Sequence, residues 1–158
     1  MERIVIKFVE RPDFKDQEKM LKWFCDVFGL SSGDDAFDSL EEQILKNFTE
    51  AAYKDKGLSS SELDLNTDLA RSTVIYHLNR FIEVGLLVKH GRKYYLRASE
   101  MQKAMEEMKY DMEREMSRMI DTAREFDRLM ETSMKKSSKT KESKKGETHS
   151  KRKGARQK

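Results

Sequence analysis

The stretch of sequence that decides the fold is 58–96, LSSSELDLNTDLARSTVIYHLNRFIEVGLLVKHGRKYYL. Apolar residues recur at helical spacing in its middle part and alternate with polar residues in its last part. Its pattern predicts four elements in this order: a short helix at 60–65, a turn at 66–68, a second helix at 71–84, and a hairpin with arms at 86–89 and 93–97. This order of elements predicts a winged helix-turn-helix.

The second predicted helix has an apolar side and a polar side. Val74, Leu78 and Phe81 fall on the apolar side, which indicates packing against the other elements. The polar side combines hydroxyl, amide and guanidinium groups, from Ser72, Thr73, Tyr76, Asn79 and Arg80. Such groups donate and accept hydrogen bonds at base edges, so we expect this side to contact bases in the major groove of DNA.

Three basic residues lie near this helix in the predicted arrangement. Arg71 stands at its start, and Arg92 and Lys93 lie at the tip of the hairpin, where they suit DNA phosphates. Two alternatives stay open. The polar side can be the solvated face of an ordinary amphipathic helix, and a winged helix can serve as a protein-interaction module within a transcription or chromatin assembly.

Charge is unevenly distributed along the 158 residues. The last 24 residues hold 11 Lys/Arg and 2 Glu, a net charge of +9, which leaves −6 on residues 1–134 because the whole chain carries +3. The segment 135–158 has no large apolar residue, so we expect it to be disordered. It suits either a sequence-independent contact with phosphates or a solubilising role.

The N-terminal part predicts a strand and two helices. The β-branched run at 3–9 indicates a strand, which would need the hairpin or a second copy of the chain as a neighbour. Asp13 is expected to cap a helix that runs to about Leu30. Asp34 or Asp35 is expected to cap another that runs to about Lys56, with Phe37, Leu40, Ile44 and Phe48 on one side.

One long helix is predicted at 99–134, with an apolar stripe. The stripe consists of Met101, Met105, Met108, Met112, Met116, Met119, Ala123, Phe126, Met130 and Met134. Its mean step of about 3.67 residues matches an eleven-residue repeat, and the helix would be about 54 Å long. A stripe of that length needs a partner helix, so we expect a homodimer interface at Met105, Met108, Met112, Met116, Met119 and Phe126. A metal site of methionine thioethers is the weaker alternative, because no Cys or His lies on that face.

Residues for catalysis or metal binding are sparse. The only cysteine, Cys25, excludes an intrachain disulfide, and we expect it to be a packed thiol rather than a redox switch. His77, His90 and His149 match no metal-ligand spacing, and no glycine-rich phosphate loop is present. We therefore expect neither an enzyme nor a cofactor. No run approaches the roughly 20 apolar residues of a membrane span, and we expect a cytoplasmic, nucleoid-associated protein.

At 72–96, STVIYHLNRFIEVGLLVKHGRKYYL, the chain resembles winged-helix regulators of the ArsR and MarR type from archaea and bacteria. The matching elements are the start at 72–74, the pair His77-Leu78, and 83–87 leading into the hairpin. The resemblance covers about 34–97. It implies a homodimer whose terminal helices form the interface and whose two recognition helices contact a roughly palindromic site.

The chain also departs from this family pattern. Metal-sensing members of the ArsR type carry cysteines on the helix before the turn, whereas 60–65 has none, so metal sensing is not supported. A histidine at the position of His77 often belongs to the fold in such families, and here it borders the apolar side.

Taken together, the sequence predicts a mainly α, α+β fold in four parts. They are an N-terminal strand–helix arm at 1–33, a winged helix-turn-helix at 34–98, a dimerisation helix at 99–134 and a disordered basic tail at 135–158. The expected function is sequence-specific binding of double-stranded DNA by a homodimeric transcription regulator. The alternatives are an interaction module that binds a protein of the transcription machinery, or a nonspecific nucleoid-type DNA binder.

Overall fold

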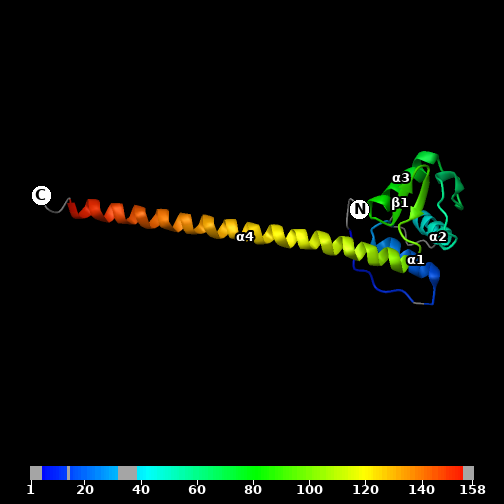
Figure 1. The fold of residues 1–158 in the computed structure, drawn as a ribbon, viewed down its shortest axis with the longest axis horizontal. Helices are drawn as coiled ribbons and strands as arrows, with labels where there is room; N and C mark the ends of the chain where they lie inside the picture. Colours follow the sequence, from blue (N-terminus) through cyan, green and yellow to red (C-terminus); the bar gives the residue numbers. More distant parts are fainter. Residues whose placement is uncertain (1–4, 14, 32–38, 155–158) are drawn as a thin grey trace. The chain divides into compact units, whose positions relative to one another are not determined.

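The computed structural model describes residues 5–13, 15–31 and 39–154, with side chains up to residue 146. Its elements in chain order are α1 (Gln17–Val27), α2 (Leu40–Tyr53), the 3-10 helix η1 (Ser60–Glu62), α3 (Arg71–Glu83), β1 (Leu87–His90), β2 (Lys93–Leu96) and α4 (Met101–Gly154) (Figure 1). The described part of the chain is mainly helical with one two-stranded antiparallel sheet, which confirms the expected class. The chain divides into two units, Met1–Met112 and Glu113–Lys158.

Side chains at the N-terminal ends of α1 and α2 explain where these two helices begin. The carboxylate of Asp16 accepts hydrogen bonds from the backbone N–H groups of Glu18 (3.0 Å) and Lys19 (3.2 Å), which caps α1 three residues later than predicted. The predicted cap of α1, Asp13, accepts from the N–H of Lys15 instead. Ser39 caps α2, and the expected caps Asp34 and Asp35 lie outside the described residues, as does Phe37.

The strand predicted at 3–9 is wrong for its described part, because residues 5–9 belong to no strand. Arg3 and Ile4 lie outside the described residues. β-branched residues favour extended backbone, but a strand also needs a neighbouring edge. Leu58 occupies the outer edge of β2, exchanging backbone hydrogen bonds of 2.8 and 2.9 Å with Tyr94. The N-terminal segment is joined instead to the end of α1, where the N–H of Lys7 donates to the carbonyl of Val27 at 2.8 Å.

The helix predicted at 71–84 is confirmed as α3, which spans 13 residues, Arg71–Glu83. The short helix expected at 60–65 forms only the single turn of η1. A capping box stabilises this turn, because the N–H of Ser59 donates to Glu62 and the side chains of Ser59 and Glu62 hydrogen-bond at 2.8 Å. The chain between η1 and α3 is irregular.

The predicted hairpin is confirmed with slightly shifted arms. Leu87 pairs with Leu96, and His90 pairs with Lys93 at the turn. Gly91 in this turn has φ +63°, a backbone conformation that costs glycine little and other residues more. Tyr94 and Leu96 are buried and Tyr95 is half-buried, as their alternation along the strand predicts.

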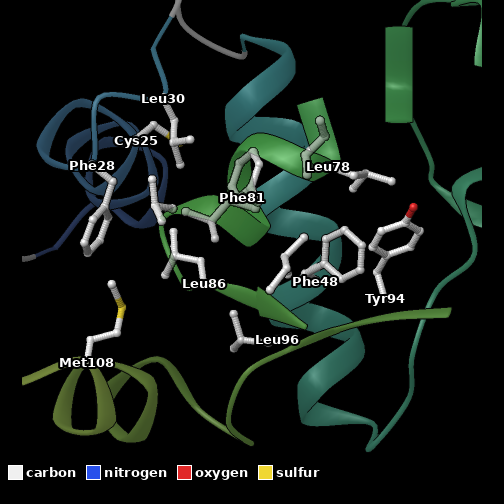
Figure 2. Close-up of a cluster of buried hydrophobic side chains, with 14 of the residues drawn as sticks. Cys25, Phe28, Leu30, Phe48, Leu78, Phe81, Leu86, Tyr94, Leu96 and Met108 are labelled. Carbon is white, nitrogen blue, oxygen red and sulfur yellow. The ribbon is translucent and has the colours of Figure 1, made fainter. Parts of the chain in front are cut away.

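One hydrophobic core unites the elements of the first unit (Figure 2). It contains residues from α1, α2, α3, the hairpin and the start of α4. In Figure 2, Phe81 of α3 lies between Leu30 on one side and Leu78 on the other, while Met108 of α4 points toward Phe28. The apolar side predicted for α3 is confirmed, because Val74, Leu78 and Phe81 are all buried.

The first methionines of the long stripe have a different role from the one predicted. Met108 is 4% exposed and belongs to the core, and Met101 and Met105 pack against it. The assignment of Met108 to a dimer interface is therefore wrong, because its side chain is buried within one chain. The sequence pattern alone could not show this, since a core-facing stripe and a partner-facing stripe have the same spacing. Met105 and Met112 are half-buried, and their assignment to a dimer interface stays a prediction.

The prediction that the chain is disordered from Lys135 is wrong for 135–154, where α4 continues as a helix. Adding a residue to an existing helix costs far less than starting one, and this segment has lysine-rich composition and no proline. The hydroxyls of Ser138 and Thr140 donate to carbonyls four residues earlier. Among the helices of the described residues, none is both long and apolar enough to cross a membrane.

Replacing Gly57 with alanine is expected to lower the free energy of unfolding by about 1–3 kcal/mol, because the ring of Tyr95 must shift to make room for the added carbon. Gly57 is buried, and an added Cβ would lie 2.6 Å from Cε1 and 2.8 Å from Cε2 of Tyr95. Urea denaturation would measure the loss. The matched control is Gly146→Ala, whose added Cβ meets nothing within 4 Å and which should leave the first unit unchanged. Equal stability of the two variants would contradict the tight packing of Tyr95 on Gly57.

Candidate nucleic-acid interface

The outward side of α3 carries most of the side chains that the sequence assigned to base contacts. Ser72, Tyr76 and Asn79 are exposed, Tyr76 by 61%, and successive members of this row are three or four residues apart. Thr73 is half-buried beside them. Arg71 is exposed at the start of the helix, and the first turn contains no acidic residue. A polar row with a cationic start can approach the electronegative groove of a duplex.

The row ends in an acidic residue. Glu83 is exposed four residues after Asn79, at the C-terminal end of α3. A carboxylate there would repel phosphates, so the part of α3 that suits DNA is its N-terminal half. At the N-terminus of α3, Ala70 stands at the N-cap and no side-chain hydrogen bond caps the helix.

The contacts of Arg80 differ from the base contact that was predicted for it. Its Nη2 donates to the carbonyl oxygen of Gly29 at 2.9 Å, and its Nη1 lies 4.0 Å from Oε1 of Glu41. The side chain is 27% exposed. The guanidinium is therefore engaged within the chain, where it joins α3 to α2 and to the end of α1. This arrangement supports a positioning role for Arg80 and gives no support to a base contact.

Glu41, Arg80 and His77 form a cluster on the inner side of α3. Glu41 is 1% exposed, and its Oε1 lies 3.5 Å from Nδ1 of His77. Its Oε2 has no hydrogen-bond partner among the described residues. Loss of one member from such a buried group is costly, because the remaining charge is left without compensation. The cluster therefore fixes the orientation of α3 on α2, and it gives His77 the structural role that was expected.

Two amides of α2, which the sequence analysis did not identify, hold the segment that precedes α3. Asn47 donates to the carbonyl of Asp64 and accepts from its N–H, both at 2.9 Å. Gln43 accepts from the N–H of Asn66 at 2.8 Å. The sequence gives only a weak indication of this role, because Gln43 and Asn47 are simply two polar residues, four positions apart, beside the apolar stripe of α2. Through them α2 sets the path of the chain into α3.

The hairpin turn presents the predicted basic residues to solvent. Arg92 and Lys93 are exposed, and Lys89 and His90 on β1 are exposed as well. The ring of Tyr95 contacts His90, with ring centres 5.8 Å apart.

Glu62 of η1 is an acidic residue close to this basic turn. Hydrogen bonds from Ser59 lower the pKa of Glu62, and the nearby charges of Lys93 and Lys56 lower it further. One carboxylate thus remains ionised near the base of the turn.

Cys25 is fully buried in the core. Burial raises the pKa of its thiol far above the ordinary value of 9.0, and the carboxylates of Glu42, Glu41 and Asp26 raise it further. The thiol is therefore protonated at neutral pH, and a protonated, inaccessible thiol reacts poorly. This agrees with the packed-thiol hypothesis.

Comparison with known proteins gives no relative for this chain: no family model, no curated protein and no solved structure matches it. In the part of the chain that the structure describes, no group of three or more His, Cys, Asp or Glu side chains could hold a metal ion.

Proposed function

We propose that this chain is a sequence-specific, double-stranded DNA-binding transcription regulator of the winged helix-turn-helix type that acts as a homodimer. The observation that carries the proposal is the division of α3 into two sides. Its apolar side lies in the core, and its N-terminal half presents a polar row to solvent; the hairpin turn of the same unit exposes the basic residues Arg92 and Lys93.

The exposed residues take different roles in this proposal. Ser72, Tyr76 and Asn79 contact base edges, with Thr73 at the border of the row. An asparagine can bond adenine through two hydrogen bonds, which makes Asn79 the main source of specificity. Arg71, Arg92 and Lys93 bind phosphates, which fixes the register of the helix in the groove. Arg80 acts indirectly, by holding α3 at a fixed angle on α2.

Selection of bound duplexes from a random pool tests the proposal. The expected result is enrichment of a short motif, repeated with two-fold symmetry if two copies bind together. A bound pool with the same base composition as the starting pool would overturn the proposal and leave nonspecific binding or a protein partner as the function.

Replacing Lys93 with alanine is expected to weaken binding to all duplexes by a similar factor, because a phosphate contact is independent of sequence. The slope of log K against log salt concentration should fall by about 1. Fluorescence anisotropy over a salt series measures both quantities. The control is Lys46→Ala, which removes an exposed lysine of α2 away from the hairpin and should leave the slope unchanged. A Lys93→Ala variant that alters the preferred sequence would contradict the phosphate role.

A nonspecific DNA binder is the second candidate, and one observation favours it. The exposed part of α4 at 135–145 carries six lysines and one glutamate. A chain that ends at Met134 separates the candidates. The proposed function predicts that it keeps its sequence preference while affinity for random duplex falls roughly tenfold or more at low salt. Loss of all DNA binding would assign the activity to the basic segment alone.

A further inference from the structure

The second unit, Glu113–Lys158, carries an apolar row that no described residue covers. Met116, Met119, Phe126 and Met130 are between 46% and 62% exposed. Ala123 and Ser133 occupy the remaining places of the row and are exposed too. Successive members are 3, 4, 3, 4 and 3 residues apart. The steps of 3, 4, 3 and 4 from Met116 to Met130 are the spacing of a left-handed coiled coil, and Ser133 continues that spacing. The exposed side chain of Met134 lies next to this last position, on the flank of the row. The longer mean step of the whole stripe comes from its two places with consecutive steps of four residues, at 108–112–116 and 126–130–134.

Three arginines of this unit form ion pairs within the helix. Arg118 pairs with Glu115, Arg124 with Asp121, and Arg128 with Glu125, each three residues apart. The middle of the row is flanked by the apolar side chains of Ile120 and Leu129, which are 52% and 54% exposed. The row and the apolar residues beside it are thus suited to contact with another helix.

We propose that a second copy of this chain covers the row, and that the two α4 helices run antiparallel. The seam consists of Met116, Met119, Ala123, Phe126, Met130 and Ser133. This inference stands independently of the DNA-binding proposal, although it supplies the homodimer which that proposal requires.

The sizes of the side chains favour the antiparallel orientation. A register centred between Arg124 and Glu125 gives three kinds of layer, each occurring twice: Ala123 opposite Phe126, Met119 opposite Met130, and Met116 opposite Ser133. Two of these layers combine a large residue with a small one, which fills the space evenly. In a parallel pair each residue faces its own copy, so two alanines would leave a gap directly beside two crowded phenylalanines.

The distribution of charge favours the same orientation. Residues 135–145 carry six lysines and one glutamate, so a parallel pair would bring two segments of net charge +5 together. An antiparallel pair places these segments at opposite ends of the seam. It also brings Glu115 of one copy beside Lys136 of the other, on the flank of the seam, where opposite charges select the orientation.

Equilibrium sedimentation of the full chain without DNA tests the seam. The wild-type chain is expected to dimerise, and Phe126→Glu should weaken the dimer by about a hundredfold or more, because each dimer loses two buried rings and gains two buried charges. The matched control is Tyr110→Glu, which replaces an exposed aromatic residue of α4 outside the seam. A monomeric wild-type chain, or a dimer that survives Phe126→Glu, would overturn the proposal.

Disulfide trapping tests the orientation, since the native Cys25 is buried and does not compete. Met116→Cys and Ser133→Cys chains should each remain uncrosslinked alone under mild oxidation and should form a disulfide when mixed. A disulfide within the Ser133→Cys sample alone would show a parallel pair and overturn the antiparallel arrangement. Both tests use the free protein, so their failure is distinguishable from a failure to bind DNA.

Discussion

Replacing Phe81 with alanine is expected to lower the free energy of unfolding by about 4 kcal/mol, within the range of phenylalanine truncations in protein cores. Phe81 is 1% exposed and lies in the middle of the core of the first unit (Figure 2). Its removal leaves a cavity between the residues that join α3 to α1 and to the hairpin. Because small domains are stable by only about 5–15 kcal/mol, this loss is a large part of the total.

Chemical denaturation, followed by circular dichroism and tryptophan fluorescence, measures this effect. Trp23 lies on α1 and therefore reports on the unit that contains the core. Glu83→Ala is the control, because Glu83 lies two residues later on the same helix but is exposed. It should change stability by no more than about 0.5 kcal/mol. A Phe81→Ala variant as stable as the control would mean that α3 does not pack on this core.

The second large effect concerns recognition. Asn79→Ala is expected to cost about 1–3 kcal/mol of binding free energy on the selected duplex, while binding to random duplex changes little. The exposed amide of Asn79 can satisfy two groups of one base, and alanine leaves both without a partner. Competition between selected and random duplexes measures the ratio of affinities, which is the quantity that should fall.

Glu83→Ala again provides the control, because it alters the same exposed row one turn further along. Removal of its negative charge should leave affinity unchanged or raise it slightly for both duplexes. If Asn79→Ala keeps the wild-type ratio of affinities, the outward row of α3 is not the source of specificity. That result would favour the interaction-module hypothesis, in which the same row contacts a protein.

The elements that could be predicted from sequence are those with strong local signals. The extent of α3 follows from the apolar period of its sequence, and Gly85 just after the helix takes φ +88°, which lets the chain leave it. The alternation of Tyr94, Tyr95 and Leu96 places the correct residues in the core. The N-terminal strand was predicted wrongly because its formation depends on distant parts of the chain. Its β-branched residues favour extended backbone, but a strand also needs a free sheet edge to pair with.

The outward and inward positions of side chains were harder to predict. Arg80 belongs to the polar side of α3 on a helical wheel, yet its partners Gly29 and Glu41 lie 51 and 39 residues earlier in the chain. Only the packing of α1 and α2 on α3 brings those groups together. The methionine stripe shows the same limit. One spacing serves the core up to Met108 and an uncovered surface from Met116.

The division of α3 into two sides has a consequence for how such a protein can change over evolution. Ser72, Tyr76 and Asn79 are exposed and lie outside the core cluster, so substitutions there cost little folding stability. The inner cluster of Glu41, His77 and Arg80 is constrained differently, because a change in one member leaves the others without compensation. If the outer side binds DNA as proposed above, new specificities can arise there by single mutations, whereas the angle of the helix can change only through coordinated mutations.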